Sequence, residues 1–169
     1  MVRGRRDKVP KTNAMRELEG SGIAFEVLTY EEEEGTPERD LGIRIAHALG
    51  VDEDSQFKTL VTVTPTGDHV VCCIPVADEL DLKKAARAVG EKSLSMMHVR
   101  DLEPVCGYRR GACSPVGMRK RFRTVVDETA QLFDRIGVSG GKKGVCLMLA
   151  PDDLVRHLQA TLCDITVGV

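Results

Sequence analysis

Two β-rich runs joined by a four-residue turn place the strongest constraint on what this chain can fold into. Residues 57–64 and 69–75 are rich in valine, threonine and isoleucine, and Pro65-Thr66-Gly67-Asp68 separates them. Proline, glycine and aspartate are typical turn residues, and short β-rich runs flanking such a turn favour a hairpin. The centre of the chain is therefore predicted to be an antiparallel pair of strands.

Helices and further strands are predicted on both sides of this hairpin. Thr12 can cap a short helix that ends at Gly20, with Ala14, Met15 and Leu18 on one face. Similar spacing at Ile43, Ala46 and Leu49 predicts a second helix that stops at Gly50. The remaining predicted elements are helices over 80–89 and 152–162 and strands over 23–29, 124–126, 132–138 and 145–149.

Strands interrupted by helices at irregular intervals indicate an α+β domain with a largely antiparallel or mixed sheet, and not a regular βαβ fold. The length of 169 residues fits one domain, which we expect over residues 12–169 after a basic, flexible leader at 1–11. The leader has no apolar stretch of the kind found in a signal peptide, and no apolar run is long enough to span a bilayer. We therefore expect a cytoplasmic protein with no membrane partner.

The six cysteines are expected to be reduced and mostly buried, since they lie mainly in apolar stretches of a chain without an export signal. No C-x-x-C pair is present. The closest approach to a metal-binding pattern is His69 with Cys72 and Cys73, and adjacent residues of a strand point to opposite faces. No metal site is predicted.

Three segments could carry chemistry. Lys58 opens an apolar strand, where it could be a lysine that only extends its ammonium into water or a fixed cation at the mouth of a pocket. The loop 111–117, Gly-Ala-Cys-Ser-Pro-Val-Gly, could be a plain surface turn or could direct backbone N–H groups at an oxyanion. The loop 139–144, Ser-Gly-Gly-Lys-Lys-Gly, could be a solvated hairpin loop or an anion site.

The net charge of −2 excludes a generally polycationic nucleic-acid binder, but basic residues crowd around the loop 111–117. They are Arg109, Arg110, Arg119, Lys120, Arg121 and Arg123. This cluster could be a solvated charged face or a docking place for a polyanion beside an active site. An acidic run at 31–34 has no assigned role. With few aromatic residues, base-specific reading of single strands is not expected.

Taken in order, these segments resemble the YbaK/EbsC family, the stand-alone relatives of the editing domain inserted in bacterial prolyl-tRNA synthetase. The resemblance runs from about Thr12 to the final helix. It rests on Leu-Thr-Tyr-Glu at 28–31, Phe-Lys-Thr-Leu at 57–60, Leu-Asp-Leu-Lys-Lys at 80–84, the loop 111–117 and Val-Ser-Gly-Gly-Lys-Lys-Gly at 138–144. It implies a compact, mainly antiparallel, barrel-like sheet wrapped by helices.

The resemblance also implies that the chain is a deacylase that discharges mischarged aminoacyl-tRNA in trans, without a cofactor. Lys58 matches the family's essential lysine, and Gly111 is carried over with it as a catalytic position. The implied substrate-binding positions are Tyr30, Thr59, Ala112, Ser114, Pro115, Ser139, Gly140 and Cys146. The implied tRNA-binding positions are Arg109, Arg110, Arg119, Lys120 and Arg121. The implied partners are mischarged tRNA and, as a further candidate, prolyl-tRNA synthetase, with no DNA.

In the YbaK branch the thiol of a misattached cysteine attacks its own ester, so that Cys-tRNA(Pro) is the expected substrate; members that edit alanine use water instead. Cys146 stands where YbaK-like members carry an aspartate, and a neutral thiol cannot bind an α-ammonium as a carboxylate does. Ala-tRNA(Pro) or another small-amino-acid ester therefore stays open as the substrate. Two other functions also stay open: a non-catalytic module that binds tRNA or a synthetase, and a thiol hydrolase. The thiol hydrolase would use Cys113 or Cys146 with His69, His98 or His157 as base.

Overall fold

The computed structural model describes residues 9–31 and 38–168, with two sheets and five α-helices among them. The larger sheet has five strands in the order β4-β2-β3-β5-β8. These are β2 (Phe57–Val63), β3 (His69–Pro75), β4 (Ser95–Met96), β5 (Arg123–Asp127) and β8 (Thr161–Cys163). The smaller, antiparallel sheet has the order β1-β7-β6, formed by β1 (Glu26–Thr29), β6 (Ile136–Ser139) and β7 (Val145–Leu149).

The predicted hairpin is confirmed as the longest strand pairing of the molecule. β2 and β3 pair antiparallel from Phe57 opposite Pro75 to Val63 opposite His69. The Thr64 hydroxyl accepts a hydrogen bond from the Asp68 amide at 3.0 Å, which closes the turn. β5 and β8 add to this pair in parallel, so that the larger sheet is mixed, as expected.

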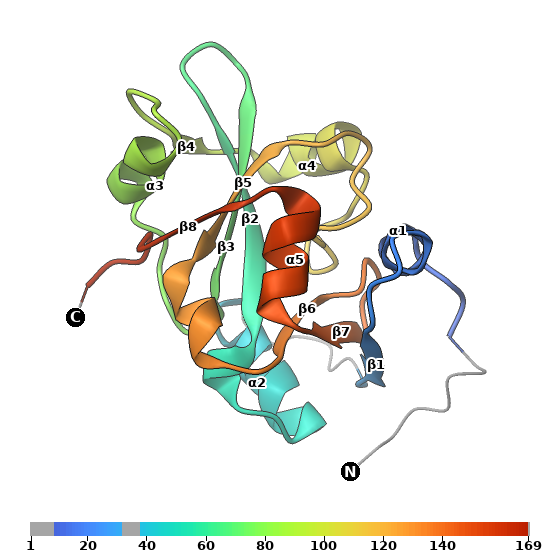
Figure 1. Ribbon diagram of the computed structural model, residues 1–169. Coiled ribbons are helices and arrows are strands. Elements are labelled where there is room, and N and C mark those ends of the chain that lie inside the picture. The colour runs from blue at the N-terminus through green and yellow to red at the C-terminus, as the bar shows by residue number, and fades with distance from the viewer. Residues whose placement is uncertain (1–8, 32–37, 169) are drawn as a thin grey trace.

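The predicted α+β class with helices around the sheet is confirmed; the two sheets of the described residues pack around a shared core and do not close into one barrel. A parallel bridge between Gln56 and Gly137 connects the start of β2 to β6. The core between the sheets is covered by α1 (Asn13–Gly20), α4 (Val99–Cys106) and α5 (Pro151–Leu158). A second apolar cluster lies on the other face of the larger sheet under α3 (Leu82–Ala88). Figure 1 shows the smaller sheet below α1, and α2 (Glu38–Leu49) at the base of the long hairpin.

Local capping explains why the predicted helices form where they do. The Thr12 hydroxyl accepts a hydrogen bond from the Met15 amide at 3.2 Å, and Ala14, Met15 and Leu18 are buried as predicted. Asp81 caps α3 through the amides of Lys83 and Lys84. The α2 helix ends at Leu49, and Gly50 follows it with φ +67°. Among the described residues, no helix is long and apolar enough to cross a membrane.

The bounds of three predicted elements need correction. The strand predicted over 132–138 begins only at Ile136, because Asp127 caps a 3₁₀ turn over Glu128–Leu132 that leaves Leu132 77% exposed. The helix predicted over 152–162 ends at Leu158, since Gln159 adopts a left-handed conformation with φ +52° and residues 161–163 pair with β5.

A third predicted element, a strand, also starts later than expected, and one α-helix and two strands were not predicted. The strand predicted over 23–29 begins at Glu26, and β4, α4 and β8 were not predicted. All six cysteines are free thiols; Cys72, Cys73, Cys106 and Cys146 are buried, whereas Cys113 and Cys163 are partly exposed. Most of the basic leader, and the acidic run beyond Glu31, lie outside the described residues.

Candidate active site

A cavity of about 520 Å³ opens along the edge of β2 that faces away from β3. The short strand β4 pairs with this edge only at Thr62 and Val63. At its start, β2 lies next to β6, and Gln56 forms a parallel bridge with Gly137 there. The cavity has apolar walls from α2, β4 and α4, including the half-exposed Met96 and Val99.

Lys58 and Thr59, two of the predicted site residues, line this cavity, and both come from β2. Burial lowers the pKa of Lys58 from the ordinary lysine value, while the nearby carboxylates of Asp78 and Glu79 act in the opposite direction. The Thr59 hydroxyl lies 3.9 Å from the Cys73 sulfur. Lys58 is thus a half-buried cation on a rigid strand, which suits it to meet a phosphate or a developing negative charge.

The loop 111–117 reaches the cavity with only part of its length. Gly111 and Cys113 line the cavity, whereas Ala112, Ser114 and Pro115 are buried and lie outside its lining. The Ser114 hydroxyl accepts a hydrogen bond from the Val116 amide at 3.3 Å, which makes this serine a support of the loop. The predicted substrate contacts of Ala112, Ser114 and Pro115 are therefore not seen as cavity-lining side chains.

Tyr108, which sequence reasoning missed, fixes the loop from behind. Its buried hydroxyl donates a hydrogen bond to the Val116 carbonyl at 2.6 Å. A Cβ atom at Gly141 would lie 2.7 Å from the Tyr108 ring, and a Cβ atom at Gly111 would lie 3.3 Å from Cε of Lys143. The two glycine-rich loops therefore lie against each other. The only sequence signal for Tyr108 was its place just before the loop.

The second glycine loop also contributes only part of its predicted residues. Ser139 lines the cavity, and its hydroxyl accepts a hydrogen bond from the Gly141 amide at 3.2 Å. Gly140 is buried, and its amide donates to the Val145 carbonyl at 2.9 Å, so it closes the β6–β7 connection and does not line the cavity. Tyr30 does line it, and its amide donates to the Gly144 carbonyl at 3.0 Å.

Cys146 lines the cavity next to Gln56, a residue that the sequence did not single out. The Cys146 thiol donates a hydrogen bond to Oε1 of Gln56 at 3.4 Å. Burial raises the pKa of Cys146 to about 12, so the thiol keeps its proton at neutral pH. Nothing in the sequence could have indicated this contact, because it joins residues far apart in the chain.

The basic cluster divides into residues with different surroundings. Arg110 lines the cavity. Arg109 pairs with Glu103 at 3.4 Å, and Arg123 binds the Val89 carbonyl and Glu91, which makes Arg123 a structural residue. Arg119, Lys120 and Arg121 are exposed beside the loop, with Nζ of Lys120 lying 5.3 Å from the centre of the Phe122 ring. Of this cluster, Arg110 is thus the residue that lines the cavity, and Arg119, Lys120 and Arg121 are exposed shortly after the loop in the chain.

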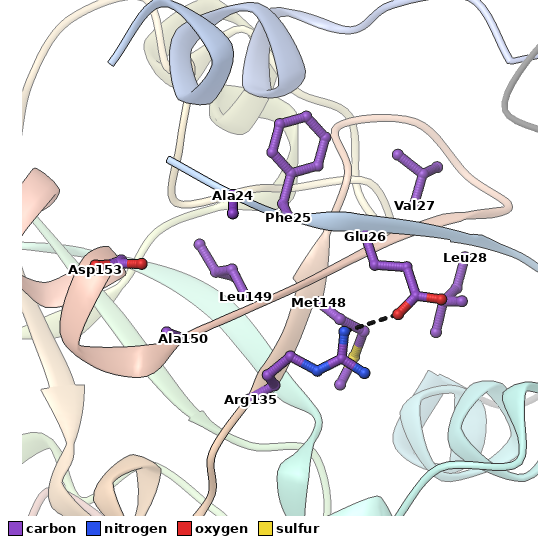
Figure 2. A pocket seen from close by; sticks show the side chains of 10 residues that line it. All are labelled: Ala24, Phe25, Glu26, Val27, Leu28, Arg135, Met148, Leu149, Ala150 and Asp153. Atoms are coloured by element: carbon purple, nitrogen blue, oxygen red, sulfur yellow. Dashed lines mark hydrogen bonds and ion pairs between the residues drawn. The ribbon is translucent and has the colours of Figure 1, made fainter. Parts of the chain in front are cut away.

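A second cavity, of about 630 Å³, lies along β1 and β7 and contains none of the predicted site residues. Figure 2 shows its main polar feature, an ion pair in which Nη1 of Arg135 lies 2.7 Å from Oε2 of Glu26, with Asp153 apart from it at the other end. The remaining lining side chains are apolar. Among the described residues, no group of three or more His, Cys, Asp or Glu side chains is placed to bind a metal ion.

Comparisons with known proteins agree with this geometry. A family model described as an aminoacyl-tRNA editing domain matches residues 39–157. An Enterococcus faecalis protein named "Putative Cys-tRNA(Pro)/Cys-tRNA(Cys) deacylase EbsC" is 42% identical over 156 residues, which cover 92% of this chain and 93% of the relative. The proline–tRNA ligase of Shouchella clausii is 31% identical over 115 residues, covering 67% of this chain and 20% of that enzyme.

Solved structures show the same fold. A structure described as "a putative trans-editing enzyme for prolyl tRNA synthetase" superimposes with a TM-score of 0.80 at 23% identity, covering 92% of this chain and 96% of that one. A scaffold used for computational epitope grafting gives a TM-score of 0.79 at 22% identity, covering 93% of this chain and 96% of its own. At this level of identity the likeness concerns the fold alone.

Proposed function

Because this chain belongs to the family of aminoacyl-tRNA editing domains, we propose that it discharges mischarged tRNA in trans and that Cys-tRNA(Pro) is its substrate. The observation that carries the proposal is a cavity that combines Lys58, Thr59, Gly111 and Ser139 at the edge of one strand. The relative named as a Cys-tRNA(Pro)/Cys-tRNA(Cys) deacylase spans nearly the whole chain, which supports this choice of substrate.

The proposed reaction needs little from the protein beyond positioning and charge stabilisation. An aminoacyl ester is already activated, so a correctly placed nucleophile can attack its carbonyl carbon. With cysteine as the amino acid, the substrate's own sulfur attacks that carbon and the ester C–O bond breaks. The thiol proton passes to the departing tRNA oxygen, so that the products are a thiolactone and tRNA with a free hydroxyl. Lys58 would offset the negative charge that develops on the oxygen atoms.

Selection for cysteine is then a property of this chemical step. A cavity that is apolar over much of its wall discriminates only weakly between side chains of similar size. A proline or serine ester lacks the thiol that attacks, and is therefore not cleaved even when it enters the cavity.

Release of label from tRNA(Pro) charged with cysteine, alanine, serine or proline tests this selection. Selective loss of cysteine is expected, and preferred loss of alanine would assign the water-dependent reaction instead.

A thiol hydrolase is disfavoured by the surroundings of the candidate nucleophiles. The hydrogen bond with Cys106, together with burial, raises the pKa of Cys113, and burial does the same for Cys146. Of the candidate bases, His157 binds Glu17 at 2.9 Å and His69 packs against Phe122. His98, by contrast, lines the cavity. A protonated thiol is a poor nucleophile.

We therefore expect the Cys113→Ser variant to retain most of its activity on Cys-tRNA(Pro). Serine preserves the size of the side chain, and the proposed reaction takes its nucleophile from the substrate. Single-turnover rates of the variant and the wild type provide the comparison. A fall to the rate of the uncatalysed reaction would instead identify Cys113 as the nucleophile.

For tRNA binding, we propose that the exposed cations beside the loop 111–117 contact phosphates. The Arg119→Ala/Arg121→Ala double variant is expected to raise KM for tRNA and to lower the slope of log affinity against log salt concentration by about 2, close to one unit for each lost contact. Arg87→Ala on α3, which removes an exposed arginine far from the loop in sequence, is the matched control. An unchanged salt slope in the double variant would exclude this role.

Association with prolyl-tRNA synthetase belongs to the proposal as well. It is suggested by the 31% identity to part of a proline–tRNA ligase and by the fold shared with a structure described as a trans-editing enzyme for that synthetase. Charged tRNA(Pro) leaves that synthetase after each reaction. An editing domain bound to the synthetase would therefore meet mischarged tRNA(Pro) directly on its release. Co-sedimentation of the two proteins with and without tRNA(Pro) would test this association.

A further inference from the structure

The side-chain amide of Gln56 is a buried polar group in the cavity wall that is satisfied mainly by weak partners. Gln56 is only 4% exposed. Its Oε1 accepts from the Cys146 thiol at 3.4 Å, and its Nε2 lies 3.4 Å from both the Met148 sulfur and the Ser55 hydroxyl. Thiols are weak donors and thioethers are weak acceptors, and an amide oxygen accepts two hydrogen bonds. A stronger donor that entered the cavity would therefore bind this oxygen favourably.

The Gln56 amide is also held in one place. It lies across the backbone of Gly137 on the neighbouring strand, and a Cβ atom at that position would overlap the amide. The Ser55 hydroxyl, which contacts Nε2, itself donates to the Asp52 carbonyl at 2.6 Å. Nε2 thus contacts Ser55 and Met148, whereas Oε1 contacts the Cys146 thiol, and both Gln56 and Cys146 line the cavity. A fixed acceptor of this kind costs little reorganisation when a ligand binds.

Few of the other side chains that line the cavity could accept a hydrogen bond from an amino group. Among the described residues that line it, none is an aspartate or glutamate, while Lys58, Arg110 and His98 supply basic groups. Hydroxyl groups also line it: that of Ser139 accepts from the Gly141 amide, and that of Thr59 lies beside Cys73. A primary amine that enters with the aminoacyl group needs an acceptor, because an amine buried without one is costly.

We propose that Oε1 of Gln56 binds the α-amino group of the aminoacyl ester, with the Gln56 side chain fixed across Gly137 and beside Cys146. This inference rests on the proposed function, because it names a contact with that substrate. Gln56 has extended backbone angles and lies two residues before Lys58, so the two residues face the same side of the strand about 7 Å apart. The amino group of the substrate would bind at Gln56 while its ester and terminal phosphate lie toward Lys58.

The test measures binding instead of turnover, so that it does not depend on catalysis. The probes are two stable analogues of the tRNA 3′ end, CCA oligonucleotides that carry an amide-linked cysteinyl group or an amide-linked 3-mercaptopropionyl group. The second probe lacks only the α-amino group. Wild-type protein is expected to bind the cysteinyl probe about 10-fold more tightly or better, the range of a hydrogen bond that involves a charged group.

Substitutions at Gln56 then separate recognition from packing. Gln56→Met keeps the size of the side chain and removes the acceptor, and it is expected to bind both probes equally. Gln56→Glu retains an acceptor and is expected to retain the preference. Met148→Leu, which alters a neighbour of Nε2 and leaves Oε1 intact, is the matched control and should also retain it. Melting curves of all variants report the fold.

The possible results separate this inference from the proposed function. Equal binding of the two probes by wild-type protein, or an undiminished preference in folded Gln56→Met, would overturn the role of Gln56. Loss of the preference in Gln56→Met supports the role of Gln56. This holds even when wild-type protein does not discharge Cys-tRNA(Pro). In that last case the proposed reaction would fail while the assigned amino-group contact would stand.

Discussion

Replacing Lys58 with alanine is expected to slow the discharge of Cys-tRNA(Pro) by about 100-fold or more, because loss of one fixed group that stabilises developing charge commonly costs this much. The ammonium lies at the edge of β2 in the cavity wall and is partly removed from water. Its electrostatic effect on a bound ester is therefore stronger than that of a fully solvated lysine. Single-turnover kinetics with saturating protein would measure the change.

The fold should survive this substitution. Burial lowers the pKa of Lys58, which means that its charged form is less favourable in the folded chain than in the unfolded chain. Removing the side chain removes this cost, so the melting temperature is expected to stay the same or rise slightly. Lys83→Ala, at an exposed lysine of α3, should leave the rate unchanged. Full activity of a folded Lys58→Ala protein would refute the role of this lysine.

The same pKa direction predicts how the reaction depends on pH. Lys58 acts in its protonated form, so the enzyme-dependent rate should fall as the pH rises through a pKa below the ordinary lysine range. The rate without enzyme, which rises with hydroxide concentration, is subtracted at each pH.

Gly117→Ala is the substitution expected to cost most stability, about 2–4 kcal/mol, because strain and steric overlap combine there. Gly117 has φ +77°, and a Cβ atom would lie 2.6 Å from the Ala14 amide nitrogen and from the Tyr108 hydroxyl. The Gly117 amide also donates to Glu17 of α1 at 3.0 Å. A side chain would therefore separate α1 from the loop 111–117 that forms part of the cavity wall. Urea unfolding would measure the free-energy change.

Gly67→Ala supplies the control for this prediction. Gly67 lies in the hairpin turn with φ +89°, and a Cβ atom there would meet no other atom within 4 Å. Its substitution should cost only the backbone strain, about 1–2 kcal/mol, and should leave discharge unchanged. If the two variants lose equal stability and both keep full activity, then the contact between α1 and the loop does not position the site.

Local chemistry explains which parts of the fold could be predicted from the sequence. The hairpin and the helix over Asn13–Gly20 depend on turn residues and a cap within a few positions, and both are confirmed. The α4 helix was missed because Pro104 lies inside it, and proline normally ends a helix. The last helix was predicted too long because its end depends on the left-handed Gln159 and on pairing of the next residues with β5.

The same distinction applies to the candidate site. Lys58, Thr59, Gly111 and Ser139 lie in recognisable motifs, and the structure brings them to one cavity. Gln56 and Tyr108 have roles that depend on long-range packing. Tyr108 joins the two glycine loops, and Gln56 fits only because Gly137 lacks a side chain. Contacts of this kind are set by the packing of two strands or loops and leave no local pattern in the sequence.

The central claim is tested most directly by the release of labelled cysteine from purified Cys-tRNA(Pro), with wild-type protein and the Lys58→Ala variant assayed side by side. We expect the wild type to discharge this tRNA well above the spontaneous rate, to spare Pro-tRNA(Pro), and to lose this activity in the variant. A folded wild-type protein that binds tRNA but releases no cysteine, alanine or serine from tRNA(Pro) would contradict the account and identify a non-catalytic binding module.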